Sequence, residues 1–144
     1  MNVETILRNK GNRVATIRPE ATLAEAVDTL DRERIGALVV SEDGAAVDGI
    51  LSERDIVIAL ARSGERLLSC RVEEVMTRNV VTCEPGDTVG DLMAEMTNRR
   101  IRHFPVLSDG RLCGIVSIGD LVKSRLDEVE FEADSLRSFI AGNA

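Results

Sequence analysis

Aromatic side chains are scarce in this sequence. Its 144 residues include three Phe and neither Trp nor Tyr, so aromatics make up 2% of the chain, while hydrophobic residues make up 44%. Any core must therefore consist of Val, Ile, Leu, Ala and Met, which suits helices packed on small sheets. A chain of this length is enough for one compact domain or for two half-sized units that share a core.

Long apolar runs and basic clusters are also missing. No stretch approaches 18 consecutive apolar residues, and residues 1–11 lack the apolar core of a signal peptide, so we expect a cytoplasmic protein without a membrane span. The net charge is −7, and no run of Lys and Arg is long enough to cover a phosphate backbone. Nucleic acid is therefore not an expected partner.

Metal ligands and catalytic groups are equally few. The three cysteines, Cys70, Cys83 and Cys113, are widely spaced, and His103 is the single histidine. This set supports neither a disulfide framework nor a zinc site. Because His103 has no Ser or Cys partner by motif, we expect a protein that is not an enzyme.

An internal repeat dominates what is present. Residues 14–57 align with residues 80–122 if the first copy has one extra residue in its second turn, and fourteen aligned positions are identical. These include Thr22 and Thr88, Arg34 and Arg100, Gly49 and Gly114, Ser52 and Ser117, and Asp55 and Asp120. Such a repeat predicts a duplicated structural unit.

Each copy predicts the element order β-α-β-β-α. A short strand (residues 14–17 or 80–83) ends before a proline, and a Thr with an acidic residue three positions later marks a helix start. Helical spacing then predicts core stripes at Leu23, Ala26, Val27 and Leu30, and at Val89, Leu92, Met93 and Met96. A β-rich run, an Asp-Gly turn and a second run predict a hairpin with a tight connection, followed by a helix from Ser52 or Ser117.

One such unit buries too little apolar surface to fold alone. We therefore predict an α+β fold of two pseudo-twofold-related βαββα repeats, with their small sheets packed together and a long C-terminal helix. The predicted divisions are an N-terminal segment at 1–13, repeat 1 at 14–61, a linker at 62–79, repeat 2 at 80–125 and the C-terminal helix at 126–144.

The duplicated motif Gly-Ile-x-Ser-x-x-Asp is the feature most indicative of chemistry. It runs from Gly49 through Ile50 and Ser52 to Asp55, and again from Gly114 through Ile115 and Ser117 to Asp120. The N–H groups of a helix start suit a phosphate, and an aspartate one turn in can accept hydrogen bonds from a ribose diol. The same residues also form a plain capping box, so both interpretations stay open.

The motif, with Arg102-His103-Phe104-Pro105-Val106 before it and Val75-Met76-Thr77 before the second copy, resembles the cystathionine-β-synthase-like (CBS) domain. Two copies resemble the tandem pair called a Bateman module. The resemblance covers residues 14 to about 125. It implies an adenosine-containing ligand, with AMP expected first and ADP, ATP, NAD or S-adenosylmethionine as others, bound in the cleft between the copies.

By this resemblance, Ser52 and Ser117 would meet phosphate, and Asp55 and Asp120 would meet the ribose. The adenine would lie among groups of the opposite copy: Ile17, Arg18, Ile35, Gly36 and Ala37 at one site, and Cys83, Glu84 and Ile101 at the other.

The two sites are not expected to be equal. The second copy has Arg102 and His103, which match a basic pair that faces phosphate in the family, where the first copy has Gly36 and Ala37. Arg54 is the only cation of the first motif that offsets this difference. We therefore expect tighter binding of phosphorylated ligands at the site with Ser117 and Asp120.

The C-terminal tail has its own pattern. From Val122, apolar residues recur at spacings of 4, 3, 4, 3 and 4, at Leu126, Val129, Ala133, Leu136 and Ile140. This 3.5-residue period is typical of a coiled-coil seam, although it is short for one that folds independently. The tail either joins a homodimer or docks on the core of its own protomer.

Together these features favour a regulatory module that senses cellular energy or redox state by binding an adenine nucleotide and acts on an effector protein of unknown identity. Signalling of this kind requires different ligand affinities in two arrangements of the protein. The alternatives are a ligand-free dimerisation or scaffold protein and a nucleotide hydrolase that uses the cleft. The missing base and metal ligands argue against the hydrolase.

Overall fold

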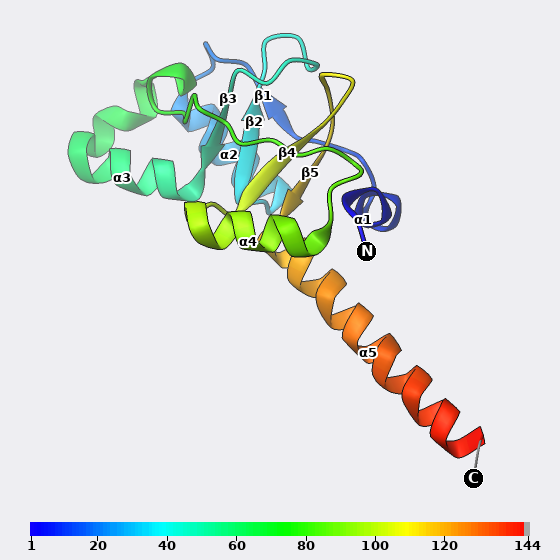
Figure 1. Ribbon diagram of the computed structural model, residues 1–144. Helices are drawn as coiled ribbons and strands as arrows, with labels where there is room; N and C mark the ends of the chain where they lie inside the picture. Colours follow the sequence, from blue (N-terminus) through cyan, green and yellow to red (C-terminus); the bar gives the residue numbers. More distant parts are fainter. Residues whose placement is uncertain (143–144) are drawn as a thin grey trace.

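The computed structural model describes residues 1–142. Two similar repeats lie side by side, and a long helix leaves one end of the body (Figure 1). The elements in chain order are α1 (Val3–Lys10), β1 (Thr16–Ile17), α2 (Leu23–Glu33), β2 (Ala37–Val40), β3 (Gly49–Ser52), α3 (Glu53–Ser63), the 3₁₀ helices η1 (Gly64–Ser69) and η2 (Val72–Glu74), α4 (Val89–Arg99), β4 (His103–Ser108), β5 (Arg111–Ser117) and α5 (Ile118–Gly142). The predicted fold class is confirmed.

The two repeats differ in their sheets. In the first, β1 pairs parallel with β2, and β2 pairs antiparallel with β3. In the second, β4 and β5 pair antiparallel, and the strand predicted at 80–83 is reduced to one parallel bridge between Cys83 and Val106. That prediction is wrong because only Cys83 bonds to β4, donating to the Pro105 carbonyl at 3.0 Å and accepting from the Leu107 N–H at 2.8 Å.

The helix starts follow the predicted signals. The Thr22 side chain accepts from the Glu25 N–H and the Glu25 carboxylate accepts from the Thr22 N–H, which completes a capping box at α2. At α4 the Thr88 side chain accepts from the Asp91 N–H. The predicted stripe residues are buried with two exceptions. Met93 is partly buried against the core of the second repeat, and Val27 is 38% exposed because it faces a surface pocket between α2 and α3.

The hairpin turns also differ. Asp109 and Gly110 have φ of 52° and 78°, as a tight two-residue turn requires. In the first repeat β2 and β3 are separated by residues 41–48, so the tight connection predicted there is wrong. The Asp43 carboxylate stabilises this longer loop by accepting from the N–H groups of Ala45 and Ala46.

Each repeat is completed by the segment that precedes the other one. Asn2 bridges to Thr88 of the second repeat, and Arg71 bridges to Thr22 of the first. Accordingly, Val3 and Ile6 of α1 belong to the core of the second repeat, whereas Leu67 and Val72 belong to the core of the first. The two repeats therefore exchange their leading segments within one chain, and α1 is fixed against repeat 2.

Helix α5 begins in the body and then extends away from it (Figure 1). Leu121 and Ser124 are buried, whereas Leu126 is 59% exposed and Leu136 is 60% exposed. The alternative in which the tail docks on the core of its own protomer is therefore wrong for the part of the tail up to Gly142. Residues 143–144 of the predicted C-terminal segment lie outside the described residues.

Candidate functional site

A pocket of about 410 Å³ is lined by both repeats and by the N-terminal segment. Six of its lining residues are predicted site residues, namely Ile35, Gly36, Ala37, His103, Ile115 and Ser117. The other five are Lys10, Arg13, Ala15, Glu33 and Arg34. The start of β2 in one repeat thus meets the helix-start motif of the other, as the resemblance implied.

Ser117 caps the pocket end of α5. Its N–H donates to Asp120 Oδ2 at 2.8 Å, and its hydroxyl accepts from the Asp120 N–H at 3.2 Å. This is the capping geometry that sequence reasoning considered. It fixes the Asp120 carboxylate beside the pocket, so the capping role and a binding role are compatible.

Lys10, from the last turn of α1, holds the same carboxylate. Its Nζ lies 2.7 Å from Asp120 Oδ2 and 3.0 Å from the Ile115 carbonyl oxygen. Burial raises the pKa of Asp120, but the bonds from Lys10 and the Ser117 N–H outweigh it, so the pKa lies below its usual value. Asp120 is therefore ionised at neutral pH.

His103 lies beside Ser117 in the pocket lining, because β4 and β5 pair these two residues. Burial lowers the pKa of His103, and the nearby cations Lys10 and Arg102 add to this effect. The carboxylates of Glu53 and Asp120 raise it, but by less than the other effects combined. The imidazole is therefore neutral at pH 7 and can still donate or accept one hydrogen bond.

The pocket is cationic although the whole chain is acidic. Lys10, Arg13 and Arg34 contribute three positive charges. Asp120 pairs with Lys10 at 2.7 Å and Glu33 pairs with Arg13 at 3.1 Å, which leaves one net positive charge. In a chain of net charge −7, this local excess favours an anionic ligand.

The equivalent motif of the first repeat has a different partner. Asp55 Oδ2 accepts from the Ser52 N–H at 2.9 Å, while Asp55 Oδ1 accepts from the Thr77 hydroxyl at 3.1 Å. Thr77 also pairs with Ile50 through two backbone hydrogen bonds. The motif carboxylate of the first repeat is therefore bonded by a neutral hydroxyl, from the segment before the second repeat, whereas that of the second repeat is bonded by the Lys10 ammonium group.

The remaining predicted site residues lie outside the lining of the 410 Å³ pocket. Ile17 packs against the core of the first repeat and Ile101 against that of the second, while burial raises the pKa of the Cys83 thiol to about 12. The charged residues among them bond to nearby groups. Arg18 forms an ion pair with Glu20, and the Arg54 guanidinium donates to the Arg100 carbonyl. Arg102 and Glu84 bond through the backbone, since the Arg102 carbonyl accepts from the Ile118 N–H and the Glu84 N–H donates to the Asp87 carboxylate.

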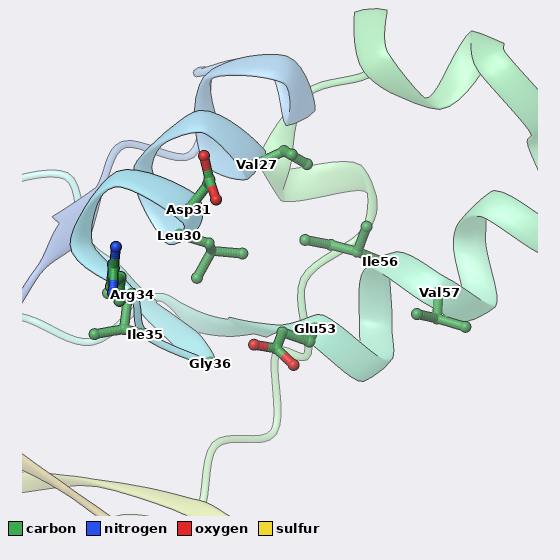
Figure 2. Close-up of a pocket in the computed structure, with 9 residues that line it drawn as sticks. All are labelled: Val27, Leu30, Asp31, Arg34, Ile35, Gly36, Glu53, Ile56 and Val57. Atoms are coloured by element: carbon green, nitrogen blue, oxygen red, sulfur yellow. The ribbon is translucent and has the colours of Figure 1, made fainter.

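A second pocket, of about 510 Å³, lies between α2 and α3. Figure 2 shows Leu30 of α2 and Ile56 of α3 pointing into the same space, with the Glu53 carboxylate at one side. All of its lining residues belong to the first repeat, so it lacks the contribution of both copies that the resemblance implies. It adjoins the smaller pocket, because Arg34, Ile35 and Gly36 line both.

Sequence reasoning missed the contribution of the N-terminal segment. A sign that the repeat extends further was present in the sequence, because Val3-Glu4 before the first repeat matches Val72-Glu73 before the second. The aligned repeats begin at residue 14, so Lys10 and Arg13 lie outside them. Only the exchange of leading segments shows that α1 serves the motif of the distant repeat.

Residues 1–142 contain neither a candidate metal cluster nor a candidate membrane span. In this range, no group of three or more His, Cys, Asp or Glu side chains is placed to hold a metal ion. Nor does any helix in it have the length and apolar character needed to cross a membrane.

Comparison with known proteins identifies the family. The sequence profile described as "CBS domain" matches residues 6–62 and again residues 72–127. The chain belongs to the CBS domain family. The CBS-domain containing protein ATU1752 from Agrobacterium tumefaciens has a similar crystal structure, with a TM-score of 0.84, 46% identity, and coverage of 87% of this chain and 99% of that one.

Other CBS proteins show the same relationship. This chain is 36% identical over 125 residues to the mitochondrial CBS domain-containing protein CBSX3 of Arabidopsis thaliana, and the match covers 84% of this chain but only 61% of that relative. The CBS domain pair of protein MJ0100, solved with 5′-methylthioadenosine and S-adenosyl-L-methionine, has a TM-score of 0.76 and 30% identity over 88% of this chain and 98% of that one.

Proposed function

We propose that this CBS pair is a regulatory module that binds an adenosine-containing ligand in the 410 Å³ pocket between its repeats. The observation that carries the proposal is the meeting of a helix-start Ser-x-x-Asp motif of one repeat with the β2 region of the other across a cationic pocket. Pockets for small ligands measure roughly 300 to 1,000 Å³, so the volume suits a nucleotide.

The lining and the adjacent Asp120 support a place for each part of the ligand. The apolar surface of Ala15, Ile35 and Ala37 suits the adenine ring, and the Asp120 carboxylate suits the ribose diol. The start of α5 at Ser117 and the cations of the pocket suit phosphate. His103 adds a polar group on the same wall.

The relative solved with adenosine-containing ligands supports this ligand class. AMP is our first choice, because one phosphate group fits the helix start at Ser117, and ADP, ATP, NAD and S-adenosylmethionine are the others to test. We propose that the site of Ser117 and Asp120 binds phosphorylated ligands more tightly than the site of Ser52 and Asp55. The pocket cations Lys10, Arg13 and Arg34 are the structural basis, since Arg102 lies outside the lining.

The test is a thermal-shift panel with AMP, ADP, ATP, NAD and S-adenosylmethionine, followed by calorimetry on each ligand that shifts the melting temperature. A ligand at 100 times its Kd should stabilise the fold by about 2.7 kcal/mol. The same panel on the Asp120→Ala variant is the matched control. A panel without any shift would reject the proposal, and hydrolysis of ATP or NAD on incubation would favour an enzyme instead.

A ligand-free scaffold is the second candidate, and the exposed face of α5 favours it. Leu126, Val129, Leu136 and Ile140 are between 45% and 61% exposed and recur at coiled-coil spacing. We propose that this face pairs with the same face of a second copy in a homodimer. Dimerisation is compatible with ligand binding, so the thermal-shift panel decides between a sensor and a scaffold.

A further inference from the structure

We propose that Lys10 makes the pocket selective for phosphorylated adenosine ligands: it holds Asp120 until a ribose replaces it, and then pairs with the ligand's phosphate. The inference rests on the proposed function and adds to it a residue that sets specificity. Lys10 is brought to the pocket by α1, which leads the first repeat but packs against the second.

The first step is a competition for one carboxylate. Asp120 Oδ2 already accepts from Lys10 Nζ at 2.7 Å and from the Ser117 N–H at 2.8 Å. The two lone pairs of Oδ2 are thus occupied, so a ribose diol that donates one hydrogen bond to each oxygen of this carboxylate needs the place that Lys10 holds on Oδ2. Binding of an adenosine ligand through both oxygens of Asp120 therefore displaces the Lys10 ammonium group.

The second step concerns the displaced charge. The backbone of Lys10 cannot move away from the pocket with the displaced ammonium group, because Val3 and Ile6 anchor α1 in the core and Leu7 lies against Gly114. The Lys10 side chain is 35% exposed, so the displaced ammonium group either turns to water or stays beside Arg13 and Arg34 at the pocket. A neutral nucleoside offers it no anion, whereas a phosphate restores a charge-assisted bond.

The first repeat has no cation bonded to its motif carboxylate among the described residues. Its motif carboxylate, Asp55, is held by the Thr77 hydroxyl at 3.1 Å, and a neutral hydroxyl leaves no charge behind when a ribose replaces it. Selection for phosphate by this mechanism is therefore restricted to the Ser117 motif. The two motifs share their Gly, Ile, Ser and Asp, so this difference at the carboxylate arises from the segments that precede the repeats.

The experiment is calorimetry of adenosine and of ADP with the wild-type chain, Lys10→Met and Arg8→Met. Arg8 is the matched control, because it is an exposed cation on the same helix, pairs with Glu4 and lies outside the pocket lining. We expect Lys10→Met to bind ADP about tenfold more weakly, the equivalent of one lost charge-assisted hydrogen bond. It should bind adenosine about two- to fivefold more tightly, because the ribose no longer displaces an ion pair.

Opposite changes for the two ligands support the inference, and Arg8→Met should change neither affinity. Equal changes for adenosine and ADP, or no change, would overturn it and leave the proposed function intact. If the wild-type chain binds neither adenosine nor ADP, the inference fails, whereas the proposed function is rejected only if the full ligand panel gives no shift. Lys10→Gln, which keeps a polar side chain of similar length, replaces Lys10→Met if the latter does not fold.

Discussion

Gly36 of the first repeat lies against His103 of the second: a Cβ added to Gly36 would stand 3.4 Å from His103 Nε2. The same Cβ would stand 3.4 Å from Glu53 Oε1. Gly36 is also absent from the positive-φ residues within 1–142, so the position does not need glycine for its backbone conformation. The missing side chain instead keeps the wall of the pocket open where the two repeats meet.

This relationship predicts that Gly36→Leu lowers ligand affinity without unfolding the protein. A leucine would fill space in the pocket, and we expect a loss of tenfold or more in calorimetry together with an unchanged circular dichroism spectrum. Gly36→Ala is the graded control, because a Cβ at 3.4 Å from movable side chains needs only a small adjustment. Full affinity in Gly36→Leu would place the ligand elsewhere.

The state of His103 predicts a pH dependence of stability. Since burial lowers its pKa in the folded protein, the unfolded chain takes up the proton first as the pH falls. The stabilising effect is therefore complete above pH of about 6.5 and declines below it. Urea unfolding at pH 7.5 and 5.5 should show a larger loss of stability for the wild type than for His103→Gln. Equal losses would contradict the assignment.

Asp120→Ala is expected to weaken nucleotide binding and to lower stability moderately. The substitution removes the carboxylate that accepts from the Ser117 N–H and from Lys10. Loss of a helix cap costs about 0.5 to 2 kcal/mol, measurable as a lower melting temperature. If the melting temperature falls but ligand affinity is unchanged, Asp120 is a cap alone. Asp55→Ala provides the comparison in the first repeat.

The two motif glycines predict unequal costs of substitution by alanine. A Cβ on Gly49 would lie 2.9 Å from the Thr77 carbonyl oxygen, which is backbone and cannot rotate away. A Cβ on Gly114 would lie 2.7 Å from Leu7 Cδ2, the end of a side chain that can change rotamer. We expect Gly49→Ala to cost about 1 to 3 kcal/mol in chemical denaturation and Gly114→Ala less. The reverse order would show that α1 is held more rigidly than the linker.

Truncation after Arg125 should convert the proposed dimer to a monomer or a looser dimer. The shortened chain keeps Leu121 and Ser124, the buried residues of α5, and removes the exposed apolar face beyond them. Light scattering should therefore report a lower mass, while the melting temperature at high dilution changes little. Unchanged mass would show that another surface joins the protomers. Substitution of Leu126 and Val129 by Ser tests the same face in the full chain.

Local sequence signals predicted the parts of the fold that depend on near neighbours. The capping box of Thr22 and Glu25 and the turn at Asp109 and Gly110 depend on residues no more than three positions apart, and both formed as predicted. The prediction failed where distant contacts decide the outcome. Residues 80–83 have strand-forming side chains, yet only Cys83 finds a partner strand.

The candidate site shows the same division. The sequence by itself determined the duplicated motif, because a Ser that caps a helix and an Asp three residues later interact within one turn. Only the tertiary structure decided which chemistry surrounds each copy. The exchange of leading segments places a cation, Lys10, on Asp120 and a hydroxyl, Thr77, on Asp55. Such a contact spans 110 residues in one case and 22 in the other, and it depends on where the packed core holds each segment.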